Sequence, residues 1–241
     1  MEVALVTGGS RGIGSCLCAT LADMGYAVII NYNKNKEKAN ILAREIVENG
    51  GVAMPYKCDV SKPKEVCEMF EYIKKEFGHI DVIVNNAGIS RFNTITDITN
   101  QEWDEMIGTN LSGTFYTCRE GAKMMISRKS GKIINISSIW GIQGASCESH
   151  YSASKSGVIG LTKALSMELA PSNITVNCIA PGAIDTDMMS MLSKEDYDTY
   201  VNEIPLGVIG SPKEIALALK YILSSNYLTG QIISPNGGVV I

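Results

Sequence analysis

Tyr151 and Lys155 stand four positions apart in the segment HYSASK, at the start of an amphipathic stretch. Positions i and i+4 project from the same face of a helix, so the phenol and the ammonium should lie side by side. A neighbouring cation favours the phenolate and lowers the pKa of the hydroxyl, which would make it usable in proton transfer. A solvated helix edge would show the same spacing, so the pair needs support from the rest of the chain.

Two other polar residues belong to the same candidate constellation. Ser138 ends the β-rich run GKIINISS, and Asn110 lies in the segment GTNLSG, where we expect a helix. Ligands of open parallel sheets bind at the carboxyl ends of the strands, which is where Ser138 and Tyr151 should meet. Asn110 by itself is equally consistent with a polar residue tolerated on a helix surface.

A glycine-rich segment, TGGSRGIG, follows the first β-rich run and opens the first helical stretch. Glycines at 8, 12 and 14 permit a tight turn, and a helix N-terminus offers free N–H groups to a pyrophosphate. The spacing G-x-x-x-G-x-G differs from the commoner dinucleotide fingerprint, and Ser15 stands where a Walker A loop requires lysine. The position between strand and helix therefore predicts a dinucleotide site.

The residues after the second strand select between the two nicotinamide dinucleotides. An acidic residue there would bind the ribose 2′-OH of NAD, but the chain has Asn31 and Lys34, with no acid before Glu37. Arg11 in the glycine loop is a second cation near the same ribose. This pattern favours NADP(H), although Arg11 and Lys34 would look the same as ordinary solvent-facing charges.

Two more strand ends carry candidate cofactor contacts. Asp59, followed by Val60, ends the third strand, where its carboxylate either accepts from an adenine amino group or caps the helix that begins at Pro63. Asn86, Ala87 and Gly88 end the fourth strand, where small residues suit either close passage of a ribose or a simple turn.

Short β-rich runs alternate with longer helical patterns along the chain. Most runs are nearly continuous in apolar residues, which is typical of strands buried on both faces of a parallel sheet. This predicts one α/β domain over residues 1–241, a doubly wound Rossmann-type parallel sheet of about seven strands with helices on both faces. An irregular segment near 182–211 is expected to hold substrate. The runs are residues 3–7, 27–32, 52–58, 81–86, 131–138, 174–181 and 230–235.

The composition excludes several classes of protein. The net charge of −4 does not favour nucleic acid or an anionic membrane as a partner. Seven scattered cysteines and two histidines give little material for a metal site, and they indicate reduced thiols in a cytoplasmic protein. The start, MEVALVTGG, lacks the features of a signal peptide, and no apolar run is long enough for a membrane span.

Taken together, TGGSRGIG, NNAG, the Asn110 segment, Ser138, the Y-S-A-S-K motif and the Pro181-Gly182 pair resemble the short-chain dehydrogenase/reductase family over the whole chain. Within it, the stretch from YSASK to IDTDM and the closing SPNGG are most similar to the bacterial 3-oxoacyl-acyl-carrier-protein reductases. The resemblance implies that Tyr151 donates a proton and Lys155 holds the nicotinamide ribose and lowers the pKa of the phenol. Ser138 would bind the substrate oxygen, and Asn110 would support a water that returns the proton.

The resemblance also implies the cofactor contacts and the reaction. The backbone of Ile184 and the hydroxyl of Thr186 should meet the nicotinamide carboxamide. The expected reaction is NADPH-dependent reduction of a 3-oxoacyl thioester in fatty-acid synthesis; the alternatives are an acetoacetyl-CoA reductase, another alcohol or hydroxysteroid dehydrogenase, or a non-catalytic NADP-binding regulator. The expected cofactor-binding residues are Gly8, Gly9, Ser10, Arg11, Gly12, Ile13, Gly14, Asn31, Asp59, Val60, Asn86, Ala87, Gly88, Tyr151, Lys155, Pro181, Gly182, Ile184 and Thr186.

Several features bear on the substrate and on partners. The methionines at 188, 189 and 191, with Leu192, form either an adaptable lid over an acyl chain or ordinary packing. A cationic cluster at 128, 129 and 132 either docks an acidic acyl-carrier protein or ends a helix in solvent. Pro171-Ser172-Asn173 and Val208 depart from relatives that dock a carrier. Cys147, Glu148 and His150 are expected near the pocket, with His150 in a local hydrogen bond, and the family implies a homotetramer.

Overall fold

A computed structural model gives the structure of the chain, and it describes residues 1–186 and 194–240. All strands run parallel in one sheet of order β3-β2-β1-β4-β5-β6-β7. The fold class expected from the sequence is confirmed. The strands are β1 (Val3–Val6), β2 (Ala27–Tyr32), β3 (Val52–Lys57), β4 (Val82–Asn85), β5 (Gly131–Ile136), β6 (Ile174–Ile179) and β7 (Ile232–Ile233).

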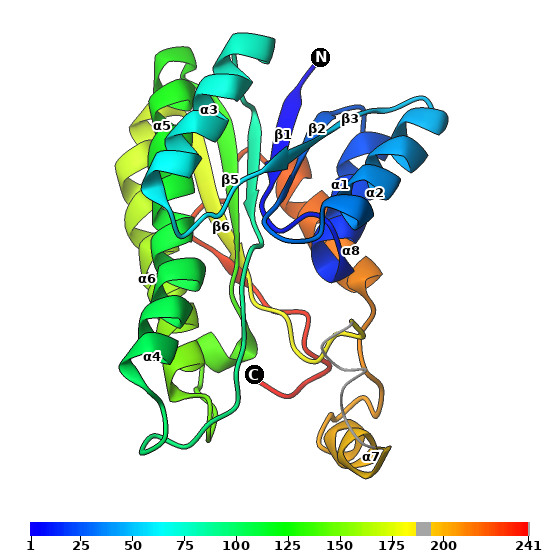
Figure 1. Cartoon of the computed structure of the whole chain (residues 1–241), viewed down its shortest axis with the longest axis vertical. Coiled ribbons are helices and arrows are strands. Elements are labelled where there is room, and N and C mark those ends of the chain that lie inside the picture. Colours follow the sequence, from blue (N-terminus) through cyan, green and yellow to red (C-terminus); the bar gives the residue numbers. More distant parts are fainter. Residues whose placement is uncertain (187–193, 241) are drawn as a thin grey trace.

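Helices cover both faces of this sheet, as Figure 1 shows. One layer consists of α1 (Gly12–Asp23), α2 (Lys36–Glu48) and α8 (Pro212–Ser224), and the other of α3 (Pro63–Phe77), α5 (Gly113–Arg128) and α6 (Ser149–Leu169). The shorter helices α4 (Asn100–Ile107) and α7 (Lys194–Asn202) lie beyond the carboxyl ends of the strands.

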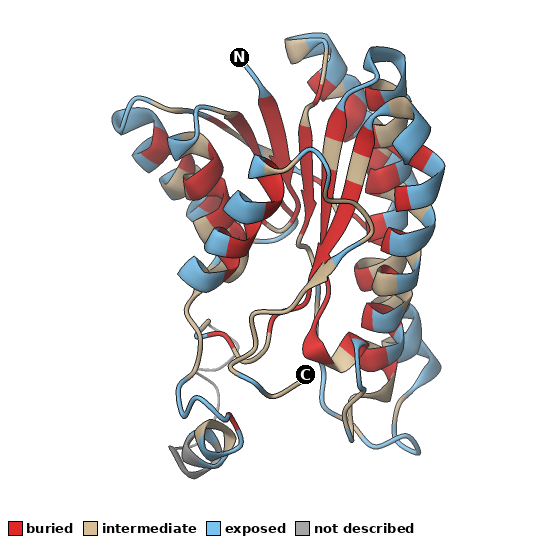
Figure 2. Cartoon of the chain, turned by 180° about the vertical axis from the view of Figure 1, so that it is seen from behind, coloured by how far each residue is buried: buried red, intermediate tan, exposed pale blue. Residues whose placement is uncertain are grey.

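The core consists of two apolar layers, one on each side of the sheet (Figure 2). In β1, Ala4 and Val6 pack toward α1, α2 and α8, whereas Val3 and Leu5 pack toward α3 and α5. Successive side chains of a strand point to opposite faces, so a strand covered on both sides must be apolar throughout. This is why the β-rich runs lack polar alternation.

The helix boundaries follow from local chemistry. Pro63 occupies the first turn of α3, where its missing N–H costs nothing, and Gly78 ends the helix with a left-handed φ of 76°. Thr99 and Glu102 form a capping box at α4, each side chain bonding the backbone N–H of the other. The start of α3 thus has one N–H fewer to satisfy, and the start of α4 has a side-chain partner for its free N–H groups.

Several expected boundaries differ from those of the structure, and three differences concern the site or the end of the sheet. The fifth strand stops at Ile136 rather than at 138, because Ser138 caps a short 3-10 turn, Ile139–Gly141, by accepting from the N–H of Trp140. The last strand has only Ile232 and Ile233 in place of residues 230–235. The irregular segment near 182–211 contains α7, whose residues 194–202 are helical.

The sheet order reverses between β1 and β4, since the chain continues from β1 to β2 on one side and from β4 to β5 on the other. The loops that follow β1 and β4 therefore leave in opposite directions and open a crevice at their carboxyl ends. The glycine loop follows β1 and the Asn86 segment follows β4, so both border this crevice.

Candidate active site

Tyr151 and Lys155 lie together in the first turns of α6, as their spacing predicts. The Lys155 Nζ atom is 5.6 Å from the centroid of the Tyr151 ring. Ser138, in the loop that follows β5, lines the same cleft, and its hydroxyl lowers the pKa of Tyr151. The sheet edge thus brings a hydroxyl, a phenol and an ammonium to one place from two separate elements.

Burial changes the acidity of the phenol in the direction opposite to the one expected. Loss of solvation raises the pKa of Tyr151 to about 12, and the Ser138 hydroxyl offsets only part of this rise. The predicted lowering by Lys155 is therefore wrong for the protein alone, because a phenolate loses more solvation at this site than its surroundings return. The positive charge of an oxidised nicotinamide ring would act in the lowering direction.

Lys155 is buried, with 4% of its surface exposed. Its ammonium donates to the carbonyl of Ile136 at 3.0 Å, and burial lowers its pKa to about 8. The Ser137 hydroxyl donates to the Lys155 carbonyl at 2.8 Å, which ties this turn of α6 to the end of β5. Lys155 is thus a fixed side chain of the core edge, not a solvated one.

Asn110 lies in a helical segment, as expected, which is a π-helical turn, Gly108–Ser112, between α4 and α5. Its amide is fully engaged: Oδ1 accepts from the N–H of Ile89 at 2.8 Å, and Nδ2 donates to the Ile89 carbonyl at 2.9 Å and to the Ser154 hydroxyl at 3.0 Å. Asn110 therefore joins the loop after β4 to α6, one turn from Tyr151. Its expected role in holding a water stays a prediction.

The glycine loop has the close packing that a dinucleotide site requires. Gly8 and Gly12 have left-handed φ values of 62° and 53°. A Cβ on Gly14 would lie 2.3 Å from the Gly8 carbonyl oxygen, so only glycine fits there. The first turn of α1 carries no acidic residue, which leaves its N-terminus favourable for a phosphate. The residues present therefore fit the pyrophosphate of a dinucleotide.

Two asparagines brace this loop. Asn86 donates through Nδ2 to the carbonyls of Thr7 and Gly8 at 3.0 and 3.1 Å. Asn31, which is buried, accepts from the N–H of Gly8 at 3.2 Å and donates to the Cys58 carbonyl at 3.0 Å. Both were expected to contact the cofactor; in the structure their side chains position the loop.

Asp59 accepts from both the N–H and the hydroxyl of Ser61, at 3.0 and 2.7 Å. It therefore stabilises the turn before α3. The sequence had left a local structural role and adenine binding as alternatives for this carboxylate. On the opposite wall, the position of a Cβ on Gly12 lies 3.4 Å from Thr186 Cγ2, so the segment after Pro181 reaches the glycine loop.

These walls enclose a cleft of about 1970 Å³ at the carboxyl edge of the sheet. Every expected site residue lines it except Gly9 and Asn110. Gly9 is buried beneath the loop, where a Cβ would meet Cys18 Sγ at 2.8 Å. The cleft is also lined by residues that sequence patterns did not single out, because they come from loops and from α7: Ser90, Trp140, Tyr200 and Glu203.

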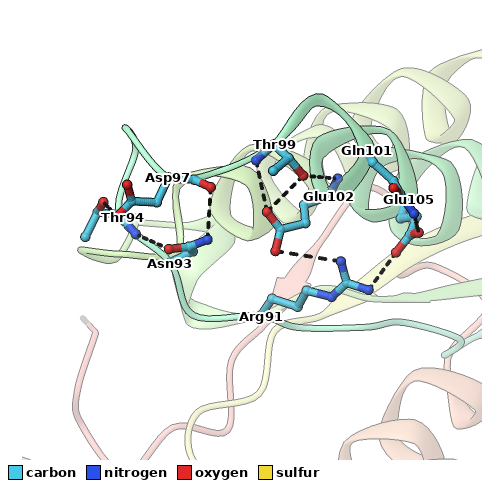
Figure 3. Close-up of polar contacts among 8 residues, drawn as sticks. All are labelled: Arg91, Asn93, Thr94, Asp97, Thr99, Gln101, Glu102 and Glu105. Atoms are coloured by element: carbon cyan, nitrogen blue, oxygen red, sulfur yellow. Dashed lines mark hydrogen bonds and ion pairs between the residues drawn. The ribbon is translucent and has the colours of Figure 1, made fainter.

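The segment between β4 and α4 lines the cleft with residues 89–92 and carries a network of polar contacts (Figure 3). Arg91 pairs with Glu105 at 2.6 Å and with Glu102 at 3.9 Å. The Thr99 backbone N–H donates to Glu102 at 2.9 Å, so the same carboxylate both caps α4 and holds Arg91. This network fixes the segment that begins at Ile89 and borders Tyr151.

Several expectations about residues around the cleft are not confirmed. Glu148 lines the cleft, but Cys147 and His150 are not among the lining residues. His150 is buried with neither ring nitrogen in a hydrogen bond, so the expected local bond is wrong. The cationic cluster is reduced, since Arg128 pairs with Asp81 at 2.8 Å and Lys132 donates to the Leu223 and Ser225 carbonyls. The expected methionine lid lies outside the described residues.

Comparison with known proteins defines the class. The family model described as "short chain dehydrogenase" matches residues 2–197. The chain belongs to the short-chain dehydrogenase/reductase family, as its motifs indicated, and is an oxidoreductase that uses a nicotinamide dinucleotide. Within the described residues, no helix has the length and apolar character needed to span a membrane.

Relatives within that family match along nearly the whole chain. A "3-oxoacyl-[acyl-carrier-protein] reductase FabG" of Staphylococcus epidermidis is 42% identical over 238 residues, covering 98% of both proteins. The protein of the same name from Chlamydia muridarum is 41% identical, covering 99% of this chain and 97% of the relative. A "3-oxoacyl-[acyl-carrier-protein] reductase" of Synechocystis sp. is 39% identical, covering 100% and 97%.

Proposed function

We propose that this protein reduces the 3-oxo group of a 3-oxoacyl thioester, carried on acyl-carrier protein, with NADPH in fatty-acid synthesis. The observation that carries the proposal is the placement of Ser138, Tyr151 and Lys155 together in one cleft with a glycine loop that fits a dinucleotide. The identity of about 42% to a full-length relative named for this reaction supports the substrate class.

Reduction of a ketone needs a hydride on carbon and a proton on oxygen, and a bound reduced nicotinamide dinucleotide supplies the hydride. Tyr151 donates the proton to the carbonyl oxygen as negative charge develops there, which yields the alcohol. Ser138 donates a hydrogen bond to the same oxygen and fixes its position. Lys155 places a positive charge beside the phenolate left behind, which stabilises it.

The preference for NADPH rests on the rim of the cleft. Arg11 and Lys34 both line it, and β2 ends in Tyr32 without an acid to bind a ribose 2′-OH. Affinities for NADPH and NADH, measured with wild type and with Arg11→Ala, test this assignment. We expect tighter NADPH binding, and a loss of that preference in the variant; tighter NADH binding by wild type would overturn it.

A Tyr151→Phe variant tests the catalytic assignment. Loss of the proton donor should lower kcat by about 10²–10⁴-fold while leaving NADPH affinity within a factor of two. Tyr227→Phe is the matched control, because Tyr227 is fully exposed and should keep wild-type turnover. Retained turnover in Tyr151→Phe would refute the role, and cofactor binding without turnover in wild type would favour a non-catalytic regulator.

The substrate class is tested by following NADPH oxidation with three carbonyl compounds: an acetoacetyl thioester of acyl-carrier protein, acetoacetyl-CoA and a sterol ketone. We expect turnover of the thioesters with the lowest KM for the carrier-protein form. Preference for CoA would indicate an acetoacetyl-CoA reductase, and turnover of the sterol alone would overturn the proposal.

We also propose that residues 1–241 form one domain, with the substrate held near 182–211, and that four copies assemble in the cytoplasm. Large apolar side chains project from the outer faces of α5, α6 and α8, and free thiols suit a reducing compartment. Light scattering of the purified protein tests the assembly, and a monomer would contradict it. The exposed apolar residues on these three helices are Phe115, Ile126, Met167, Leu217 and Tyr221.

A further inference from the structure

Glu148 lies directly before α6, and its side chain lines the same cleft as Tyr151. The N–H of Ser152 donates to the Glu148 carbonyl at 2.8 Å, so Glu148 is the N-cap residue of α6, with a backbone that is itself not helical (φ −130°, ψ 32°). A carboxylate, a phenol and an ammonium, at 148, 151 and 155, thus line one cleft at the start of α6.

The carboxylate is held by the opposite wall of the cleft. The Ser90 hydroxyl donates to Glu148 Oε1 at 2.9 Å, and the N–H of Asn93 donates to the Cys147 carbonyl at 2.7 Å. Glu148 makes no side-chain hydrogen bond to the N-terminus of α6. The carboxylate is thus fixed beside the cleft, and it does not cap the helix.

Burial raises the pKa of the Glu148 carboxyl, and the Ser90 hydroxyl opposes that rise. A carboxyl nevertheless ionises several pH units below a phenol, so Glu148 is negative wherever Tyr151 titrates. Its negative charge adds to burial in raising the pKa of Tyr151. Glu148 therefore acts on the phenol with a negative charge from the residue that precedes α6.

The other titratable groups around this face are accounted for. Tyr200 on α7 also raises the pKa of Tyr151, and the pKa of Tyr200 is itself raised by burial, with Glu148 and Glu203 adding to it. On the β4–α4 side, Arg91 pairs with Glu105 and Glu102. The remaining groups that line the cleft and carry charge are Arg11, Lys34, Asp59, Lys62 and Asp104.

We propose that Glu148 is a positioning residue for the proton donor: its carboxylate keeps the Tyr151 hydroxyl protonated over a wider pH range. The proposal rests on the proposed function, which gives Tyr151 the donor role. Reduction needs the protonated phenol and alcohol oxidation needs the phenolate. Glu148 therefore extends reduction toward higher pH and delays the onset of oxidation.

The test is Glu148→Gln, which removes the charge and keeps the shape and the acceptor for Ser90. The ionisation of Tyr151 is followed by tyrosinate absorbance, as the difference between each protein and the same protein carrying Tyr151→Phe, with and without NADP⁺. We expect the Tyr151 transition to move down by about one pH unit, a tenfold gain of phenolate at fixed pH. The falling limb of the reduction rate should move down with it.

Two further variants separate charge from structure. Glu148→Asp keeps the charge, and Ser90→Ala removes the hydrogen bond but leaves the carboxylate; both should hold the Tyr151 transition near wild type. An unchanged transition in Glu148→Gln overturns the proposal, and so does an equal shift in Ser90→Ala. Absorbance needs no turnover, so if no carbonyl compound is reduced, the proposed function fails while the titration still decides the role of Glu148.

Discussion

Replacing Asn110 by alanine should destabilise the protein although the residue lies outside the cleft lining. The side chain is 1% exposed and makes three hydrogen bonds to nitrogen or oxygen partners, two with Ile89 and one with Ser154, besides a weak one to the Met106 sulfur. At about 1 kcal/mol net for each bond, the loss is ~3 kcal/mol. Water can reach the half-buried Ile89 backbone, and alanine favours a helix, so we expect a measured loss of about 2–3 kcal/mol.

The assay is urea unfolding followed by circular dichroism at one fixed protein concentration, because the stability of an oligomer depends on concentration. Asn49→Ala is the control, since Asn49 is exposed and its amide makes a single bond, to the Glu45 carbonyl at 2.8 Å. The control should lose less than about 0.5 kcal/mol. Equal losses in the two variants would refute the reasoning that buried amide bonds fix the loop after β4.

Two further predictions concern the cofactor loop and pH. Gly14→Ala should weaken NADPH binding at least about tenfold, because its Cβ would lie 2.3 Å from the Gly8 carbonyl oxygen, whereas Gly160→Ala, with nothing within 4 Å, should bind normally in the same fluorescence titration. Burial lowers the pKa of Lys155 from 10.5 to about 8, so between these values the unfolded chain binds more protons and stability should rise with pH. Relative to Lys155→Met, wild type should gain up to about 3 kcal/mol of unfolding free energy across that window, and a constant difference would contradict the assignment. The buried Cys58 and Cys118 thiols, whose pKa values are raised, act in the opposite direction in both proteins and cancel in this comparison.

Much of the architecture follows from local pattern. The apolar runs predict β2 with its exact bounds, 27–32, because a strand covered on both faces must be apolar along its length. Pro63 and Gly78 likewise bound α3 as expected. The strand ends at 136 and 233 could not be predicted, since they depend on how Ser138 caps the next turn and on which neighbouring strand remains to pair.

For the candidate site, the sequence by itself determined which groups share a helix face: a spacing of four residues is enough to bring Lys155 to within 5.6 Å of the Tyr151 ring. Only the tertiary structure decided how those groups behave. Solvation depends on every element that surrounds a side chain, so burial, which no local pattern records, raises the pKa of Tyr151 and lowers that of Lys155. The same reason applies to Asn110. Its position in the sequence equally allowed an exposed amide, and only the packing of the π-helical turn against Ile89 and Ser154 buries it.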